Sequence, residues 1–350
     1  MEIALCGFYG KSNFGDDLMA DCLPEVLSLG GRHNVTVFSD CESHGVKSAK
    51  NELNYFNYDV VVIGGGGIIN PKFWAFKKAE LEKLIQSQAP IFFLNVNVTE
   101  DFNLEQGFPE QIARLNARWW VRDDFSHTIL AKHGIQSKVL PDISFRITNH
   151  SMPKDQKKLL FFPNAYLLNK LFCKNNTLDY IKAHESAFTI ANFLDWMAHF
   201  GWKIEFIPSQ TGKDFDDRIV GGLIYSLMQR KDVAFWQSNS LPWVNIIHKI
   251  CESDLVISMR YHASTVSIAS GVSLIDITHH AKNKNLMRDL NLESVSVDYD
   301  ALSHNALVSA ANNSHMIKSS EINLFNQMAK KSWDEFIVEW SLIMANLEKR

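Results

Sequence analysis

The sequence has little cysteine, and its cysteines form no recognised pattern. Five occur among 350 residues, an odd number, far apart and without a C-x-x-C pair. This usage indicates buried, reduced thiols in a cytosolic protein and excludes the disulfide framework of a small secreted domain. The five are Cys6, Cys22, Cys41, Cys173 and Cys251.

Long apolar runs are also missing. No stretch approaches the roughly 18 uninterrupted apolar residues of a membrane-spanning helix. The opening MEIALCGF has no basic segment before its apolar run, so it is predicted to be a strand and not a signal peptide. We therefore expect a cytoplasmic protein that contacts the inner face of a membrane at most peripherally.

Neither sign of charge dominates the sequence. Its 35 lysines and arginines are intermixed with 39 aspartates and glutamates, for a net charge of -4. Without a basic arm or stripe, nucleic acid is not an expected partner. His279 and His280 are adjacent, but no second cluster of ligating residues stands at a spacing that completes a metal site. We expect no metal and no cofactor, and no feature of the sequence indicates an oligomeric state.

What the sequence does contain is a regular alternation of short apolar runs with helical patterns. EIALCGF, VTVFS, DVVVIGGGG and PIFFLNVNV are continuous apolar runs separated by helical segments, as in a parallel sheet covered on both faces. The length suits two domains of typical size. We predict two Rossmann-like, doubly wound α/β domains, residues 1–148 and 158–325, facing a cleft. A polar linker, 149–157, joins them, and a C-terminal helix, 326–350, packs on the body.

Ligands of doubly wound sheets bind beyond the carboxyl ends of strands, so the turns after strands are the places to search for function. The first is GFYGKSNFGDD, in which Gly10 and Gly15 allow close approach of a ligand and a helix begins near Asp16. The spacing is not G-x-G-x-x-G, so a dinucleotide is not indicated. A capped helix after a tight turn explains one acid, but not Asp16 and Asp17 beside Asn13.

Three further segments in the first half carry candidate residues. Four successive glycines follow DVVVI, more than a plain turn needs, which favours close approach of a ligand over that of a neighbouring backbone. They are Gly64, Gly65, Gly66 and Gly67. Arg122 stands at the end of another strand, where a surface ion pair is an equal alternative to substrate binding. Asp142 is interpreted equally well as a cap or as a substrate contact.

The most informative segment is VISMRYHASTVSIASGV, a buried strand followed by a helix of small residues. Arg260, Tyr261 and His262 stand at the junction, where a guanidinium offers a planar fork to a carboxylate or phosphate. A helix N-terminus adds further attraction for an anion. After the next strand, His280 and Lys282 are expected on a neighbouring strand end. We predict a site for a small, multiply anionic substrate.

Taken in order, these segments resemble the polysaccharide pyruvyl transferase family, whose members are similar to GT-B glycosyltransferases in architecture. GFYGKSNFGDD is similar to that family's G-[YF]-x-G-x-x-N-x-GD-[DE] start, VVVIGGGGII to its glycine run, and VRDDFSHTILAKHGI with LPDISF to its V-R-D segment. LVISMRYHASTVSIASGVSLIDI resembles its R-[LY]-HA element and the strand that follows. FLNVNVT and LLFFPN depart from the family pattern at positions where an acceptor could lie.

The resemblance implies an enzyme that transfers the pyruvyl group of phosphoenolpyruvate to two hydroxyls of a sugar. The product is a pyruvate ketal on a bacterial surface polysaccharide or its precursor, free or on a lipid or nucleotide carrier. The C-terminal domain is then the phosphoenolpyruvate side and the N-terminal domain the acceptor side. Arg260 and Lys282 hold anionic groups, His262 protonates the enol carbon, and Asp16 or Asp17 accepts protons from the hydroxyls. The implied substrate-binding residues are Gly10, Asn13, Gly15, Gly65, Gly66, Gly67, Arg122, Tyr261, His280 and Lys282.

Two other functions stay open at this point. A GT-B glycosyltransferase or a nucleotide-sugar epimerase would place the diphosphate of a UDP-sugar against the same arginine and glycine turns. A binding module without catalytic activity would need neither His262 nor the acid pair. For the acceptor, the second half offers aromatic and cationic side chains, although most aromatic residues in such a domain belong to the core. They are Tyr166, Lys170, Trp196, Trp236 and Trp243.

Overall fold

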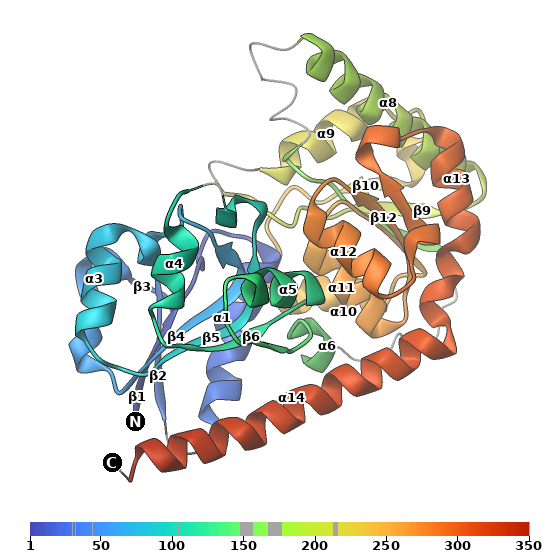
Figure 1. The fold of residues 1–350 in the computed structure, drawn as a ribbon. Coiled ribbons are helices and arrows are strands. Elements are labelled where there is room, and N and C mark those ends of the chain that lie inside the picture. The colour runs from blue at the N-terminus through green and yellow to red at the C-terminus, as the bar shows by residue number, and fades with distance from the viewer. Residues whose placement is uncertain are drawn as a thin grey trace. The chain divides into compact units, whose positions relative to one another are not determined.

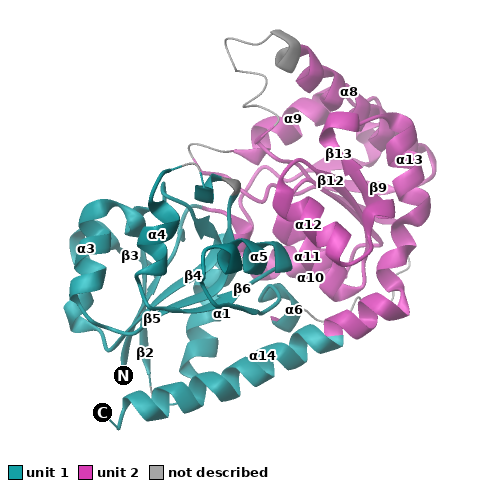
Figure 2. Ribbon diagram, in the orientation of Figure 1, with its two compact units in different colours: residues 1–11, 16–146, 327–350 teal, residues 12–15, 147–326 magenta. Residues whose placement is uncertain are grey.

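The structure is a computed structural model that describes residues 1–29, 31, 33–43, 45–103, 105–147, 157–166, 177–212 and 216–349. The chain forms two compact units (Figure 2). The first comprises Met1–Lys11, Asp16–Arg146 and Gln327–Arg350, and the second Ser12–Gly15 and Ile147–Asn326. Of the linker expected at 149–157, only the last residue lies within the described residues, and Lys170 and Cys173 lie outside them.

The first unit is built on a seven-stranded parallel sheet in the order β3-β2-β1-β4-β5-β6-β7 (Figure 1). Its strands are β1 (Glu2–Cys6), β2 (Asn34–Ser39), β3 (Lys47–Ser48), β4 (Val60–Ile69), β5 (Ile91–Val98), β6 (Arg118–Val121) and β7 (Lys138–Val139). Its helices are α1 (Phe14–Ser28), α2 (Ala49–Glu52), α3 (Lys78–Gln86), α4 (Phe108–Ala113), α5 (Asp124–Lys132) and α6 (Ser144–Ile147). The strand order reverses between β1 and β4.

The second unit has a six-stranded parallel sheet in the order β10-β9-β8-β11-β12-β13. Its strands are β8 (Lys158–Phe162), β9 (Lys203–Phe206), β10 (Ala234–Trp236), β11 (Leu255–Ser258), β12 (Ser273–Thr278) and β13 (Ser296–Asp298). Its helices are α8 (Thr177–His199), α9 (Asp217–Leu227), α10 (Trp243–Cys251), α11 (Tyr261–Ser270), α12 (Ala281–Asp289) and α13 (His304–Asn313). Here the order reverses between β8 and β11.

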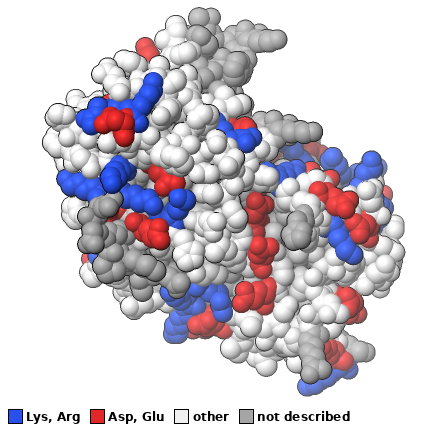
Figure 3. Space-filling view, turned by 180° about the vertical axis from the view of Figure 1, so that it is seen from behind, with Lys and Arg blue, Asp and Glu red and all other residues white. Residues whose placement is uncertain are grey.

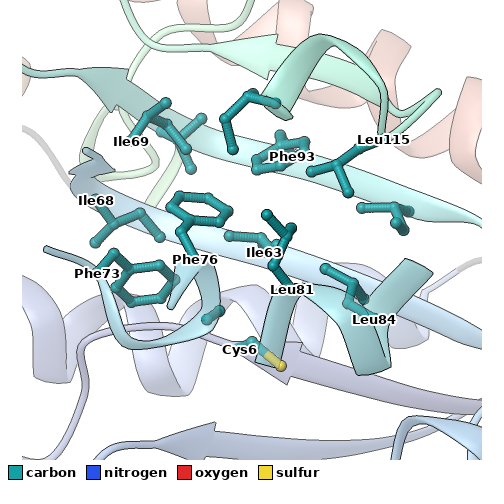
Figure 4. Close-up of a cluster of buried hydrophobic side chains, with 14 of the residues drawn as sticks. Cys6, Ile63, Ile68, Ile69, Phe73, Phe76, Leu81, Leu84, Phe93 and Leu115 are labelled. Atoms are coloured by element: carbon teal, nitrogen blue, oxygen red, sulfur yellow. The ribbon is translucent and has the colours of Figure 1, made fainter. Parts of the chain in front are cut away.

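The two parallel sheets with helices between their strands confirm the predicted fold class. The continuous apolar strands are buried, as the pattern of alternating runs predicts. Figure 4 shows part of the first core, in which Ile63 and Phe93 of the sheet meet Phe76, Leu81 and Leu84. Burial of this kind supplies about 25 cal/mol per Å² of apolar surface removed from water.

Three of the five cysteines have the buried thiols that their spacing predicts. Cys6, Cys22 and Cys251 are buried and free, and Cys41 is free and half-buried. Burial raises the pKa of the Cys6 thiol far above its usual range, so that thiol stays protonated and behaves as an apolar side chain.

The glycine run corrects one expectation. We predicted Gly64–Gly67 to follow a strand, whereas β4 continues through them to Ile69. Gly65 and Gly66 adopt left-handed backbone, with φ of 72° and 92°, and the register with β5 shifts after Gly66. Because only glycine adopts this conformation without strain, the strand can bulge here and still resume pairing.

The C-terminal helix α14 (Ser320–Leu347) begins earlier than the expected residue 326 and carries residues of both units. Trp333 and Trp340 are fully buried in the first unit, and their indole nitrogens donate to the carbonyls of Pro141 (2.9 Å) and Leu27 (3.0 Å). Its three-to-four-residue apolar rhythm is thus explained by packing. None of the helices in the described residues combines the length and the hydropathy needed to cross a membrane.

Charge is mixed on the surface as it is in the sequence. Figure 3 shows one face of the molecule, where most groups of lysine and arginine lie beside aspartate and glutamate. Exposed ion pairs of the chain include Lys72–Asp101 (2.6 Å) and Lys138–Glu339 (2.7 Å). Exposed pairs of this kind contribute little to stability.

Candidate functional site

Side chains gather at the carboxyl edge of the second sheet, around the point where its strand order reverses. Asn164 follows β8, Gln210 follows β9, Arg260 follows β11, and His279 follows β12. A reversal of strand order leaves a crevice beyond the strand ends, which is the usual ligand position in doubly wound sheets. The residues predicted from sequence at Arg260–His262 and His280–Lys282 therefore belong to one neighbourhood.

Arg260 is held in place by a buried carboxylate that the sequence did not single out. Its Nη2 donates to Oδ1 of Asp217, the first residue of α9, and its Nη1 donates to Oε1 of Gln210 (3.0 Å). Asp217 is fully buried and also accepts from the backbone N–H groups of Ala165 (2.8 Å), Ser209 (3.1 Å) and Gln210 (2.9 Å). Asp217 thus ties together the ends of β8, β9 and β11.

The protonation of Asp217 is set by opposing effects. Burial raises the pKa of Asp217, while the Arg260 guanidinium and the backbone N–H groups lower it. Because every contact named above is a donor aimed at the carboxyl oxygens, we interpret the group as an ionised carboxylate paired with Arg260. The arginine side chain stays 15% exposed, which leaves part of its cationic fork accessible to a ligand.

His262 lies in the first turn of α11 against a short segment of the N-terminal loop. Ser12–Gly15 belongs to the second unit, since Phe14 N–H donates to the carbonyl of Ser209 (2.7 Å) and Asn13 bridges to Gln210. The ring of Phe14 meets the imidazole of His262 edge-on, with centroids 6.5 Å apart. A Cβ on Gly15 would lie 1.8 Å from Nδ1 of His262. The absence of a side chain at Gly15 therefore makes room for the histidine.

The helix that carries His262 is buried over its whole length. Its hydroxyls bond to carbonyls of their own helix, as Ser267 does to Ala263 (2.7 Å) and Ser270 to Val266 (2.7 Å). Hydroxyls satisfied in this way can enter a core without unpaired polar groups. The small residues noted in the sequence thus allow α11 to pack within the unit and place its N-terminus at the sheet edge.

A second missed residue, Asp276 of β12, lies beside this helix. Asp276 is fully buried and accepts from Ser264 Oγ of α11 (2.5 Å) and from Asn283 Nδ2 of α12 (3.0 Å). Burial raises the pKa of Asp276 to about 6, although both hydrogen bonds lower it. The carboxyl group links the two helices that carry His262 and Lys282.

A second group of side chains at this sheet edge follows β12 and consists of His279, His280 and Lys282. The two imidazoles lie 4.1 Å apart, and the ring of Tyr166 lies 4.6 Å from His279. Lys282 Nζ lies 5.3 Å from the ring centroid of Tyr261, within the range of a cation–π interaction. Asn164 Nδ2 lies 3.1 Å from Nε2 of His279 and also donates to the carbonyl of Met259 (3.0 Å).

Both imidazoles are neutral at physiological pH. Desolvation lowers the pKa of His279 to about 2, and the charges of His280, Arg260 and Lys282 add to the shift. Desolvation, Lys282 and Arg260 lower the pKa of His280 to about 4, even though part of that side chain remains exposed. Desolvation is the main cause of both shifts, and the positive charges of Arg260 and Lys282 act in the same direction.

In the first unit the corresponding reversal point lies between β1, which is followed by Gly10 and the acid pair, and β4, which contains the glycine run. Gly10 has φ of 73°, and a Cβ there would lie 2.0 Å from Ser43 Oγ, so it is required by its neighbour. Asp17 accepts from the N–H of Gly10, while burial and the nearby Asp21 raise the pKa of Asp17 to about 6. A Cβ on Gly66 would lie 3.5 Å from Oδ1 of Asp16.

The remaining glycines of the run have structural explanations of different strength. Cβ atoms on Gly64 and Gly65 would lie 2.8 Å from Leu5 Cδ1 and from Met19 Sδ respectively. Tyr9, fully buried, donates its hydroxyl to the carbonyl of Gly64 (2.5 Å). Gly67 is exposed and has only Thr99 nearby, at 3.5 Å. Close neighbours thus explain Gly64 and Gly65. Gly66 is buried beside Asp16, and Gly67 is the exposed glycine of the run.

Arg122 has a structural partner that weakens its assignment to substrate. Its Nη1 donates to Oδ2 of Asp142 (2.7 Å) in a pair with 0% and 1% exposed side chains, and its Nη2 donates to Asn97. The ion pair is buried, not on the surface. Oδ1 of Asp142 caps the N–H of Ser144 (3.0 Å), and Asn95 holds the adjacent loop through Ile143 N–H (3.2 Å). FLNVNVT therefore contributes two asparagines to the frame of the first unit.

No group of three or more histidines, cysteines, aspartates or glutamates in the described part of the chain is arranged to hold a metal ion. The chemistry available at the second sheet is that of two cations, three imidazoles and the N-termini of α11 and α12. Such a set can bind an anion and move protons.

Solved structures with the same fold share little sequence with this chain. MnaA from S. aureus with UDP is 11% identical at a TM-score of 0.57, covering 99% of this chain and 97% of that one. UDP-GlcNAc 2-epimerase from Neisseria meningitidis with UDP-GlcNAc is 11% identical at 0.56, covering 100% of both chains. Spinosyn forosaminyltransferase SpnP is 9% identical at 0.54, covering 100% of this chain and 98% of that one. At these identities the likeness establishes a GT-B-like fold alone.

Sequence comparison gives the finer assignment. None of the curated proteins matches the chain. The family model for polysaccharide pyruvyl transferase matches residues 13–280, a range that includes the Asn13–Gly15 segment, Asp217, the Arg260–His262 junction and His280. Since that range is well over half of the sequence, the chain belongs to the polysaccharide pyruvyl transferase family.

Proposed function

We propose that this protein transfers the pyruvyl group of phosphoenolpyruvate to two hydroxyls of a sugar, forming a pyruvate ketal and inorganic phosphate. The observation that carries the proposal is the meeting of Arg260, His262 and Lys282 at one sheet edge in a member of this transferase family. The sugar belongs to a bacterial surface polysaccharide or its precursor. The donor is a substrate, and the reaction uses no cofactor.

Charge supports the choice of donor. Phosphoenolpyruvate carries a carboxylate and a phosphate, and it would meet the Arg260 guanidinium, the Lys282 ammonium and the N-termini of α11 and α12. Arg260 is already oriented by Asp217 and Gln210. A preorganised cation of this kind costs little reorganisation when the anion arrives.

In the first chemical step, His262 protonates C3 of the enol, which becomes a methyl group and leaves C2 electrophilic. One sugar hydroxyl attacks C2, forming a C–O bond and releasing its proton to a base. The bond between C2 and the phosphate oxygen then breaks, and phosphate leaves with the electron pair. The second hydroxyl attacks C2 and releases its proton, which completes the ketal. One proton is taken up at C3, two leave the hydroxyls, and one of those departs on phosphate, so protons balance.

Asp16 and Asp17 are our proposed proton acceptors. With a pKa raised to about 6, Asp17 is mostly ionised at pH 7 and still basic enough to accept a proton transiently. Asp16 lies beside Gly66 in the first unit, since a Cβ at that glycine would lie 3.5 Å from Oδ1 of Asp16. Either carboxylate can therefore act as a base in the first unit.

The test is phosphate release from phosphoenolpyruvate in the presence of a panel of glycosides, with the mass of the ketal product as the second readout. His262→Gln should reduce turnover by about 100-fold or more and leave the thermal unfolding midpoint close to that of the wild type. Near-normal turnover in His262→Gln would remove this histidine from the mechanism.

The UDP-sugar alternative is supported by fold alone and predicts a different result. A thermal shift with UDP or UDP-sugars, and none with phosphoenolpyruvate, would favour a glycosyltransferase or epimerase. Stabilisation by phosphoenolpyruvate that is lost in Arg260→Gln would support the pyruvyltransferase. Binding of phosphoenolpyruvate without turnover on any glycoside would instead indicate a binding module.

A further inference from the structure

Beside the anion site, the second unit exposes a tryptophan on the edge strand of its sheet. Trp236 ends β10, and its side chain is partly open to solvent, as is that of Phe235 before it. Of the residues that the sequence offered as acceptor contacts, Trp236 is exposed, whereas Trp196 packs between Phe193 and Phe200. A large aromatic side chain left open at a sheet edge often marks a binding surface.

Two glycines of α9 lie against this indole. Gly221 and Gly222 lie in the interior of α9, where each glycine costs about 1 kcal/mol relative to alanine. A Cβ on Gly222 would lie 3.2 Å from Cζ2 and Cη2 of Trp236, and one on Gly221 would lie 3.6 Å from Nε1. Tyr225, one turn further on, has its ring nearly parallel to the indole at 6.4 Å. Gly222 thus allows the indole to lie close against α9 while part of the indole remains open to solvent.

The groups next to the indole are polar. Within the described residues, the Nε1 of Trp236 has no hydrogen-bond acceptor. The chain continues as Gln237-Ser238-Asn239-Ser240, largely exposed amides and hydroxyls. Arg218, fixed by Asp216 through Nε (2.8 Å) and Nη2 (2.6 Å), points Nη1 at the carbonyl of Ser238 (3.5 Å). An aromatic face beside amides and hydroxyls matches the apolar C–H face and hydroxyl rim of a pyranose.

The position relative to the anion site follows from α9. Asp217, which anchors Arg260, and Gly221, which seats the indole, are four residues apart on this helix. Four residues correspond to a rise of about 6 Å along the helix, so the contact with Arg260 and the contact with the indole lie about one turn apart on α9. Gly221 also approaches Pro163, which follows β8 at the same sheet edge, since its Cβ would lie 3.3 Å from Cγ of that proline.

We infer that Trp236 and the Gln237–Ser240 loop form a saccharide subsite that holds the acceptor glycan. This inference rests on the proposed function for its role, though not for its chemistry. It places an acceptor contact in the second unit, in addition to the first unit that the sequence suggested. It also implies that the acceptor is recognised as a sugar ring, independently of any lipid or nucleotide carrier.

The test is saturation-transfer NMR on the whole protein with methyl β-galactoside, methyl β-glucoside, methyl α-mannoside, lactose and cellobiose. At least one glycan should show transfer from the wild type, with Trp236→Ala reducing that transfer at least fivefold and Trp236→Phe keeping most of it. Phe235→Ala is the matched control. Phe235 is an exposed aromatic residue of the same strand whose side chain points to the opposite face of the sheet, so this variant should retain the signal.

Several results would overturn the inference. They are an unchanged glycan signal in Trp236→Ala, an equal loss in Phe235→Ala, or no signal from any glycan with the wild type. A change of sedimentation coefficient in Trp236→Ala without a glycan effect would instead identify the indole as a protein interface. A lack of phosphoenolpyruvate-dependent phosphate release with an intact, Trp236-dependent glycan signal would reject the pyruvyltransferase function and keep the subsite.

Discussion

The backbone of Gly15 and the imidazole of His262 fit together with no room for a side chain between them. A Cβ at position 15 would stand 1.8 Å from Nδ1, 2.2 Å from Cε1 and 2.4 Å from Cγ of the ring. The glycine lies just before the acid pair, and the histidine lies on α11, more than 240 residues later. Two motifs that are distant in the sequence are thus one structural feature of the second unit.

The first prediction tests this contact. Gly15→Ala should push the imidazole from its position and reduce kcat by about 10-fold or more, because proton transfer depends on the placement of the donor. Gly201→Ala is the control for stability. Gly201 has φ of 85° and open space around it, so alanine there should cost about 1 kcal/mol in unfolding free energy and leave kcat unchanged. Equal kcat values for both variants would refute the role of the contact.

A second prediction concerns the anchor of Arg260. Asp217→Asn removes the negative charge that orients the guanidinium, and we expect KM for phosphoenolpyruvate to rise about 10-fold or more, with a smaller change in kcat. The variant should also lose stability in urea, since breaking a buried pair leaves an uncompensated charge. The control is Asp232→Asn, which breaks the exposed Arg230–Asp232 pair (2.9 Å) and should change neither quantity measurably. A fall in kcat at constant KM would argue against an orienting role.

The histidine pair gives a prediction about protons. The pKa values of about 2 for His279 and about 4 for His280 make both imidazoles neutral at pH 6 in the free protein. A bound anion offsets the charges of Arg260 and Lys282, so the pKa values rise on binding and protons are taken up. Calorimetric titration with phosphoenolpyruvate in two buffers of different ionisation enthalpy should therefore show proton uptake, and less of it in His280→Gln.

Comparison with the variant is essential because phosphoenolpyruvate has an ionisable phosphate of its own. That contribution is common to both proteins and cancels in their difference. Proton uptake should increase as the pH is lowered from 7 towards 5, because the pH then comes closer to the histidine pKa values of the complex. An identical proton count in wild type and His280→Gln, or proton release, would contradict the expectation for this residue.

The buried carboxyl of Asp276 makes stability depend on pH. With a folded pKa of about 6 against about 3.9 in the unfolded chain, the folded state binds more protons between these values. Stability should therefore fall as pH rises from 4 to 6, by up to about 3 kcal/mol. Asp276→Asn removes the titration, so urea midpoints of wild type and variant should diverge with rising pH, in favour of the variant. A constant difference between pH 4 and pH 8 would show that Asp276 does not titrate in this range.

Much of the fold was predictable from the sequence because continuous apolar strands and helical rhythms are local signals. EIALCGF and VSLIDIT become β1 and β12 within one or two residues. The R-Y-H junction was also predictable, since it follows a strand and opens a helix. Its partners were not. Asp217 and Gln210 reach Arg260 only through the order of strands β9, β8 and β11, which no local pattern records.

The glycines also show that a sequence does not reveal which atoms surround a residue. Gly10, Gly15, Gly64 and Gly65 were interpreted as room for a ligand, yet the atoms next to them belong to Ser43, His262, Leu5 and Met19. A sequence shows that a Cβ is absent and does not show what occupies its place. The role of Arg122 was equally hard to predict, because a buried carboxylate and a bound anion would both favour an arginine. The structure provides the carboxylate, Asp142, twenty residues later.

The path of α14 has a consequence for biosynthesis. The first unit takes its outer helix from residues Gln327–Arg350, and two of its fully buried tryptophans come from there. During translation, about 180 residues of the other unit are made before those side chains appear. The N-terminal unit can therefore bury Trp333 and Trp340 only after this helix has been synthesised.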